Sequence, residues 1–157
     1  MAKKQLYWED VKVGDEVTTL AHVFTSQTLV RFAGGGGDFN PLHYEFQFAQ
    51  ANLQPRPIVH GQFKRAVLVH MLTDWIGDQG RIKKFGCQFR GVDLPRLMKS
   101  MGEPQDGETW YAKGKVTAKR AEDGEHLVDC EIGLENAQGQ VTTPATATVA
   151  LPSKGQK

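Results

Sequence analysis

An aspartate and a histidine stand close together in the sequence after a run of four glycines. The glycines occupy positions 34–37, and Asp38 and His43 follow on either side of an Asn40-Pro41 step. Glycine permits backbone conformations closed to other residues and leaves room for a ligand. Proline fixes its own φ and restricts the residue before it. The segment therefore predicts two proton-transferring groups held near each other on stiffened backbone.

The Asn40-Pro41 step also favours the start of a helix, because Asn is a preferred N-cap and Pro a preferred first helical residue. We expect this short helix to span 41–52, with His43 in its first turn and Asp38 just before it. An imidazole there can accept a proton from water and return one, as general acid–base catalysis requires. The alternative is that Asp38 only caps a turn and His43 only decorates a surface helix.

A second candidate element, His60-Gly61, opens the strongest helical pattern of the chain. The N–H groups of a helix N-terminus lack intrahelical partners and lie at the positive end of the helix dipole. An oxygen that gains negative charge would be stabilised there, and Gly61 would let it come close. A His-Gly pair alone is more often an ordinary loop-to-helix junction, so its weight depends on Asp38 and His43.

Other chemistries find no support in the motifs. The glycine run lacks the continuation of a phosphate loop and the spacing of a dinucleotide fingerprint. We find no His-Glu-x-x-His or similar ligand cluster, so we expect no metal and no cofactor. Cys87 and Cys130 lack the spacing of a zinc or redox motif and suit a reducing compartment, although two cysteines could pair. We interpret His22 and His126 as solvated strand residues.

Composition places the chain among ordinary globular proteins. Its 157 residues fit one domain with a real core. Lysine and arginine total 19 against 18 acids, a net charge of +1, so no global field favours nucleic acid or a membrane surface. No stretch approaches the roughly 18 apolar residues that span a bilayer, and no apolar segment follows the basic N-terminal residues. We expect a soluble, cytoplasmic protein.

The elements that must position the candidate residues are helices first and strands later. A short helix over 26–33 should begin at Ser26 and end at the glycine run. The helix over 61–76 is apolar nearly all round and should be buried on most sides, with only its first turn wet at Gln62, Lys64 and Arg65. Alternating patterns predict strands within 11–25, 85–89, 110–119, 128–135 and 141–151.

Short polar turns join the later strands, which predicts consecutive hairpins and an antiparallel sheet with one solvated face. We therefore expect an α+β fold in which the sheet curls around the long helix. The chain should form a single domain over 1–152 with a flexible C-terminal tail over 153–157. The interval 95–105 interrupts the strand series and is either a mobile flap over a site or a packed loop.

Residues 32–43, including the Asp-x-Asn-Pro-Leu-His segment, resemble the hydratase-2 motif of MaoC-like dehydratases and (R)-specific enoyl-CoA hydratases. Residues 8–15 are similar to the family's N-terminus, and 57–61 resemble its second landmark. The resemblance covers 6–151. It implies a hotdog fold, in which an antiparallel sheet wraps around a long central helix and dimers usually join their sheets edge to edge. The implied reaction adds water reversibly to a trans-2-enoyl thioester and yields the (R)-3-hydroxyacyl form.

Carried over by position, Asp38 and His43 would activate the water and move the proton of the α-carbon, in an order that stays open. The Gly61 N–H would hold the thioester carbonyl, with Asn40 and His60 as further oxyanion or substrate-binding residues. The resemblance implies no cofactor and no metal. The substrate would be a thioester of CoA or of acyl-carrier protein.

Two departures from the family concern the surroundings of the site. Many relatives carry a serine about two turns after His-Gly, whereas residues 66–72 offer no hydroxyl, and His70 or a water would have to substitute. The interval 95–105 also looks longer than in compact relatives. Four cations could meet the phosphates of CoA or could simply be solvated: Lys64, Arg65, Arg96 and Lys99.

Two other functions stay open beside the hydratase/dehydratase. A hotdog acyl-CoA thioesterase would hydrolyse the same substrates, and a hotdog subunit would act only with a partner chain. We expect a homodimer or higher homo-oligomer, with a heterodimer of two hotdog chains as the alternative. No nucleic-acid or membrane partner is expected.

Overall fold

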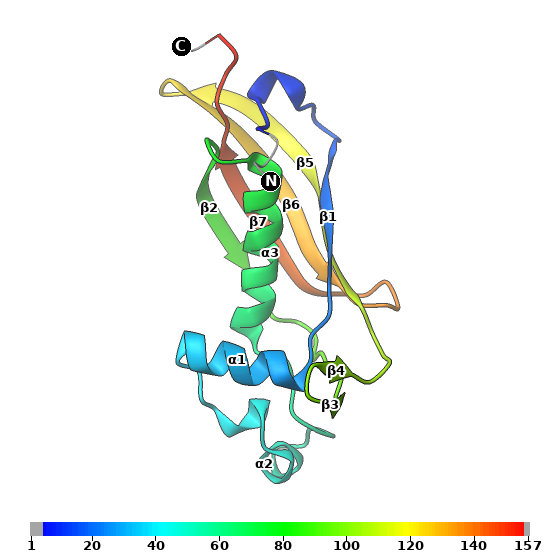
Figure 1. The fold of residues 1–157 in the computed structure, drawn as a ribbon. Coiled ribbons are helices and arrows are strands. Elements are labelled where there is room, and N and C mark those ends of the chain that lie inside the picture. The colour runs from blue at the N-terminus through cyan, green and yellow to red at the C-terminus, as the bar shows by residue number, and fades with distance from the viewer. Residues whose placement is uncertain (1–4, 156–157) are drawn as a thin grey trace.

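A computed structural model describes residues 5–155 of the chain (Figure 1). These residues form two short 3-10 helices, three α-helices and seven strands. Their bounds, in chain order, are η1 Trp8–Asp10, β1 Glu16–His22, α1 Ser26–Gly36, η2 Pro41–His43, α2 Phe46–Ala51, α3 Gly61–Ile76, β2 Arg81–Cys87, β3 Met98–Ser100, β4 Glu103–Pro104, β5 Trp110–Glu122, β6 Glu125–Glu135 and β7 Val141–Ala150. None of the described helices is long and apolar enough to cross a bilayer.

Five strands form one sheet in the order β1-β5-β6-β7-β2, with every neighbouring pair antiparallel. The β5–β6 turn places Asp123 and Gly124 at φ 49° and 76°, the left-handed pair that a tight hairpin turn requires. The sheet wraps around α3, and α1 and α2 lie beyond the N-terminal end of that helix (Figure 1). The expected α+β fold with a sheet around a long helix is therefore confirmed.

The core lies between α3 and the concave face of the sheet. Alternate residues of β6 face it, because side chains of a strand alternate between faces. Fully or almost fully buried residues from α3 and the sheet are Val67, Leu68, Met71, Leu72, Ile76, Trp110, Val116, Val128, Cys130, Ile132 and Leu134. Cys87 and Cys130 are unpaired, and burial raises the pKa of the Cys130 thiol to about 12.

The surroundings of α3 differ from the expectation in two ways. Gln62 and Arg65 are exposed as expected, but so are Ala66 and His70 beyond the first turn, because within this chain the sheet covers only one side of the helix (Figure 1). Lys64, which we expected to be solvated in the first turn, is only 2% exposed. Helical spacing places Lys64 on the same face as Val67 and Leu68, and its buried partner lies far away in the sequence.

The helix that precedes the glycine run begins with a different cap and ends later than predicted. Thr25, not Ser26, is the N-cap: its hydroxyl accepts a hydrogen bond from Thr28 N at 3.0 Å, and the Thr28 hydroxyl accepts one from Thr25 N. The helix continues through three glycines to Gly36. Gly37 stops it with φ 74° and an N–H bond to Ala33 O, the left-handed ending that favours glycine.

Three further expectations need correction. The helix expected over 41–52 is divided into η2 and α2. The strand expected over 85–89 begins and ends earlier, as β2 over Arg81–Cys87. His22 is not a solvated strand residue: its ring packs edge-on against Phe24 and Phe63 at centroid distances of 4.6 and 5.4 Å, and its buried Nε2 has no hydrogen-bond partner among the described residues. Burial, and then the neighbouring His70, lowers the pKa of His22.

The interval 95–105 is tied to the start of α1. Arg96 N donates to Phe24 O at 2.8 Å, and Ser26 N donates to Arg96 O at 2.9 Å. The next residues form the small β3–β4 hairpin. These main-chain bonds favour the packed-loop interpretation over a mobile flap.

The C-terminal residues contact the N-terminal 3-10 helix. Ser153 Oγ and Lys154 N donate to the carboxylate of Glu9. The hydrogen bond from Ser153, followed by the backbone N–H groups of Glu9 and Lys154, lowers the pKa of Glu9 to about 2. The expected flexible tail thus begins with residues that make these contacts, while its last part, 156–157, lies outside the described residues.

Candidate active site

The turn that follows α1 positions both candidate side chains, Asp38 and His43. Asn40 Oδ1 accepts a hydrogen bond from Leu42 N at 3.0 Å, so Asn40 is the N-cap and Pro41 the first residue of η2. This confirms the predicted helix start at the Asn-Pro step. The helix lasts for one turn only, which places His43 at its last residue, and Asp38 lies just upstream.

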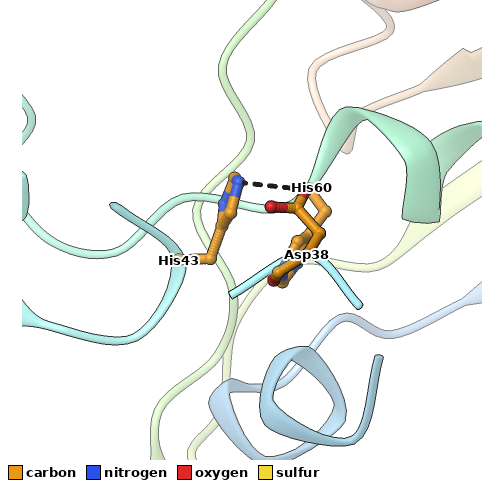
Figure 2. Close-up of side chains that lie close together, drawn as sticks. All are labelled: Asp38, His43 and His60. Carbon is orange, nitrogen blue, oxygen red and sulfur yellow. Dashed lines mark hydrogen bonds and ion pairs between the residues drawn. The ribbon is translucent and has the colours of Figure 1, made fainter. Parts of the chain in front are cut away.

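His43 and Asp38 face each other across a gap. Nε2 of His43 lies 3.9 Å from Oδ2 of Asp38, with the two side chains 10% and 41% exposed (Figure 2). Nδ1 of His43 lies 2.8 Å from Ile58 O. A carbonyl oxygen only accepts, so Nδ1 carries the hydrogen and Nε2 presents its lone pair toward Asp38. The gap is too long for a direct hydrogen bond and suits one water that touches both groups.

The ring of His60 packs against the ring of His43. The two imidazole rings are stacked with centroids 3.7 Å apart and planes 23° apart, and His60 is 0% exposed. His60 Nε2 donates to Asp38 O at 3.3 Å, and within residues 5–155 its buried Nδ1 has no hydrogen-bond partner. Burial, and then the charge of a protonated His43, lowers the pKa of His60. A neutral His60 therefore supports the ring of His43 and the backbone of Asp38.

Gly61 begins α3 immediately after His60. The N–H groups of Phe63 and Lys64 both donate to His60 O, at 3.1 and 3.2 Å, whereas no hydrogen bond is found from Gly61 N or Gln62 N within the described part of the chain. A Cβ at position 61 would lie 2.8 Å from Cδ2 of Phe89. Glycine is therefore required by the close approach of the Phe89 ring, and a free amide stands one residue from the stacked histidines.

Main-chain bonds hold the segment 58–61 from two sides. Ile58 N donates to Leu42 O at 3.2 Å, and Val59 N donates to Asp93 O at 2.9 Å. Sequence reasoning missed Ile58, because every residue has a carbonyl and nothing marks this one. It also missed Asp93. The sequence did offer a signal for this residue, because an acid stands there between the apolar residues Val92 and Leu94.

The structure thus brings together Asp38, His43 and His60, with Gly61 adjoining, and uses the Asn40 side chain as a helix cap. His70, considered as a substitute for the missing serine, lies 3.1 Å from Asp74 on the exposed side of α3, with its own side chain 61% exposed. Of the four candidate cations, Lys64 is buried against Asp93. Arg96 donates to Glu108 O and to Thr109 Oγ1, at 2.9 and 3.0 Å.

The same three side chains place possible metal-ligand atoms within 4.8 Å of one another: Asp38, His43 and His60. The geometry does not suit a shared ion. Stacked imidazole rings direct their nitrogen lone pairs side by side rather than toward one point, and His60 Nε2 is engaged as a donor to Asp38 O. Our expectation of a metal-independent site stays a prediction.

A hollow of about 950 Å³ lies elsewhere, on the sheet, with Gly86, Gly133 and Pro144 among its lining residues. Two lysines in its lining, Lys113 and Lys115, already face carboxylates of Glu135 and Glu131, at 2.6 and 3.7 Å. None of the site residues described above lines this hollow. We place the candidate active site at Asp38 and His43 because proton-transferring groups gather there.

Known proteins similar to this chain include enzymes and solved structures that match different parts of it. Enoyl-CoA hydratase ChsH3 of Mycobacterium tuberculosis (strain ATCC 25618 / H37Rv) is 32% identical over 78 residues, which are 48% of this chain and 27% of that protein. The stretch that matches another curated relative covers 3% of that relative's length. The chain is therefore similar to only part of each of these two relatives.

Solved structures share the fold over nearly the whole chain. The (R)-hydratase from A. caviae involved in PHA biosynthesis has a TM-score of 0.76 and 23% identity, covering 92% of this chain and 99% of that one. The ChsH1-ChsH2 complex from Mycobacterium tuberculosis contains a chain with a TM-score of 0.72 and 21% identity, covering 89% and 98%. The hotdog fold is confirmed.

The family follows from the part of the chain that carries the site. Residues 9–101 match the model of the MaoC like domain. This range includes Asp38, His43, His60 and Gly61 together with all of α3. The chain belongs to the MaoC-like dehydratase family.

Proposed function

We propose that the protein is an (R)-specific enoyl-thioester hydratase, or in the reverse direction a 3-hydroxyacyl-CoA dehydratase. The observation that carries the proposal is the facing pair of His43 Nε2 and Asp38 Oδ2, 3.9 Å apart, with the His43 tautomer set by Ile58 O. A basic nitrogen and a carboxylate at this separation can hold one water between them. Membership of the MaoC-like family supports a hydro-lyase.

In the hydration direction, the water donates one hydrogen bond to Asp38 and one to His43. His43 Nε2 takes a proton as the water oxygen bonds to the β-carbon of the enoyl thioester and the double-bond electrons move toward the thioester carbonyl. The resulting imidazolium then delivers its proton to the α-carbon. Asp38 orients the water and stabilises the imidazolium while it exists. Atoms and charge balance without any redox or metal step.

The negative charge that develops on the thioester oxygen needs a donor at that point. Gly61 N–H has no partner in the described residues and stands at the N-terminus of α3, where the helix dipole favours negative charge. Removing an oxyanion donor typically lowers the rate by about 10²–10³. The Gly61 amide therefore supports the proposal as strongly as the water site does.

We further propose that the protein acts as a homodimer that joins sheets through an edge strand. β2 lies at one edge of the sheet, and one side of α3 is uncovered within this chain (Figure 1). A sheet edge presents unpaired backbone groups that another strand can bond. The ChsH1-ChsH2 complex, which has a similar chain fold, supports a heterodimer of two hotdog chains as the alternative.

The decisive experiment follows absorbance of the conjugated enoyl thioester after addition of the protein. We expect loss of that absorbance with short-chain to medium-chain trans-2-enoyl-CoA and formation of the (R)-3-hydroxyacyl product, identified by chiral chromatography. A homogeneous oligomer that turns over no enoyl thioester of any chain length would contradict the proposal. Recovery of activity only after a second hotdog chain is added would instead establish the partner-dependent subunit.

The thioesterase alternative has its own readout on the same substrates. Release of free thiol, detected with a thiol reagent, together with an unhydrated acid would establish hydrolysis. The Asp-x-Asn-Pro-Leu-His segment around Asp38 and His43 resembles the hydratase branch of the fold, which supports addition rather than hydrolysis. We therefore expect no thiol release above the uncatalysed rate.

A further inference from the structure

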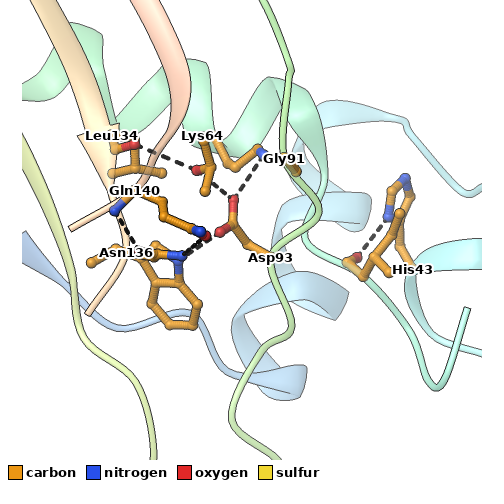
Figure 3. Close-up of polar contacts among 10 residues, drawn as sticks. His43, Lys64, Gly91, Asp93, Leu134, Asn136 and Gln140 are labelled. Carbon is orange, nitrogen blue, oxygen red and sulfur yellow. Dashed lines mark hydrogen bonds and ion pairs between the residues drawn. The ribbon is translucent and has the colours of Figure 1, made fainter. Parts of the chain in front are cut away.

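A buried ion pair lies next to the site and has no part in the proposed proton transfers. Lys64 in the first turn of α3 is 2% exposed, and Asp93 is 3% exposed. Lys64 Nζ donates to Asp93 Oδ2 and to Gly91 O, each at 2.8 Å (Figure 3). Removing two charges from water is costly, and a buried pair of this kind often contributes little to stability. Its position therefore calls for another explanation.

The carboxylate of Asp93 accepts hydrogen bonds from three different elements. Trp110 Nε1 of β5 donates to Oδ1 at 2.9 Å, and Thr142 Oγ1 of β7 donates to Oδ2 at 2.8 Å. Lys64 adds α3 to these two strands (Figure 3). Three donors from three elements leave the side chain of Asp93 a single position, and with it the backbone of the segment 91–93.

The backbone of Asp93 is connected to the site by a hydrogen bond with Val59. Asp93 O accepts from Val59 N at 2.9 Å. The residue before Val59 provides the carbonyl that bonds His43 Nδ1, and the residues after it are His60 and Gly61. A shift of Asp93 would therefore move both the group that sets the His43 tautomer and the amide that holds the thioester oxygen.

The same segment also positions the ring of Phe89, which covers Gly61. Gly91 N donates to Thr142 O at 3.0 Å, and a Cβ at Gly91 would lie 2.8 Å from Thr142 Cβ. Phe89, two residues upstream, lies against Gly61, with Lys64 Nζ 5.9 Å from its ring centroid. Lys64 thus contacts the segment both at Gly91 and beside Phe89.

We propose that the Lys64–Asp93 ion pair is a positioning device for the reaction: it joins α3 to the segment 91–93 so that Ile58 O holds His43 with Nε2 facing the water. This inference rests on the proposed function for its effect on rate, whereas its effect on His43 is independent of any activity. Lys64 and Asp93 do not touch the reacting atoms, so they are positioning residues.

The test compares Asp93→Asn and the double variant Lys64→Met/Asp93→Asn with two controls. The double variant removes both buried charges, and the Asn side chain keeps an oxygen that accepts from Trp110 and an NH2 that can donate to the Thr142 hydroxyl, which guards against a simple failure to fold. Ile76→Ala creates a cavity at the opposite end of α3, where Ile76 is 2% exposed. Lys113→Met breaks an ion pair with Glu135 that lies on the exposed side of the sheet, away from the edge strand β2.

The readouts are kcat, KM and the ring-nitrogen NMR signals of His43 in the substrate-free protein. We expect both Asp93 variants to lower kcat by about tenfold to a hundredfold, since small misplacements of reacting groups have effects of this size, with KM changed less than threefold. The His43 signals should move from a single Nδ1–H tautomer to a mixture. Both controls should keep the wild-type His43 signals, even where Ile76→Ala unfolds as readily as Asp93→Asn.

Wild-type His43 signals in the double variant would overturn the proposal, as would a wild-type kcat. An equal loss of kcat in Ile76→Ala at matched stability would reduce the ion pair to a structural role. If the wild-type protein turned over no enoyl thioester, the proposed function would fail, and the NMR comparison would still decide whether the ion pair sets the His43 tautomer.

Discussion

The imidazole of His43 is stacked on that of His60, with ring centroids 3.7 Å apart and ring planes 23° apart. Two imidazolium ions at this distance would repel each other strongly, since Coulomb repulsion grows as the separation falls. His60 is fully buried and its pKa is lowered, by burial first and by His43 second. The lowered pKa of His60 therefore favours a neutral His60 ring stacked against His43.

The first prediction concerns stability at acid pH. A histidine with a lowered pKa in the folded protein stabilises it fully above the unfolded value, near 6.5, and the contribution is lost as pH falls toward the folded value. His22 and His60 both behave this way. We expect the free energy of unfolding, measured with urea, to fall between pH 7.5 and pH 5, by no more than about 1.4 kcal/mol per pH unit for each histidine.

The variant that checks this assignment is His22→Phe. It removes a titrating group and a buried Nε2 without a partner, and it keeps a ring beside Phe24 and Phe63. We expect a smaller loss of stability from pH 7.5 to pH 5 than in the wild type. An unchanged pH dependence would show that His22 is already free to protonate in the folded protein.

The second prediction concerns the reacting pair. Asp38→Asn removes the carboxylate charge beside the water, and His43→Gln removes the proton acceptor at Nε2. General acid–base catalysis contributes about 10²–10⁴ to a rate, so each variant should lose kcat by a factor in this range. Circular dichroism should remain unchanged, because Asp38 is 41% exposed and is outside the core. More than a tenth of wild-type kcat in His43→Gln would exclude His43 from the proton transfer, and the same result in Asp38→Asn would exclude Asp38 from orienting the water.

The third prediction concerns Gly61. Gly61→Ala keeps the amide donor but places a Cβ 2.8 Å from Cδ2 and 3.1 Å from Cγ of Phe89. Because Cγ is the inner end of the ring, the whole side chain must move. We expect kcat to fall by about tenfold or more through the displaced segment. The double variant Gly61→Ala/Phe89→Ala should recover most of the loss, and the difference between the single and double variants measures the steric part.

If the double variant were as inactive as Gly61→Ala, the methyl group itself would obstruct the thioester oxygen. Phe89→Ala alone is the matched control. Its ring is 46% exposed, so we expect little loss of stability and a modest change in KM.

Local signals in the sequence predicted the helix start at the Asn40-Pro41 step and the long helix well. The Asn40-Pro41 step is a local cap, and the capping hydrogen bond of Asn40 forms as expected. The period of the apolar residues identified α3 from its first residue to its last. These features depend on neighbours within a few positions, which is why sequence alone was sufficient.

The errors concern contacts between distant segments. Lys64 looks like a solvated residue of a first helical turn, because its partner Asp93 becomes its neighbour only when the segment after β2 returns to α3. His22 looks solvated by alternation, but the register of β1 against β5 shifts between Val17 and Leu20. Such a bulge changes which residues face the core, and a period-two pattern does not reveal it.

The last prediction separates the two roles open to Asn40. In the structure its Oδ1 accepts from Leu42 N, as a cap does, and no other side-chain bond of Asn40 is found among the described residues. Asn40→Asp keeps an acceptor and should therefore preserve stability and most of kcat. Asn40→Ala loses the cap, and we expect it to lower the free energy of unfolding by about 1 kcal/mol and kcat by severalfold through a loosened His43. Equal losses of kcat in both variants, with the Asp variant still stable, would mean that the Asn40 amide contacts the substrate instead.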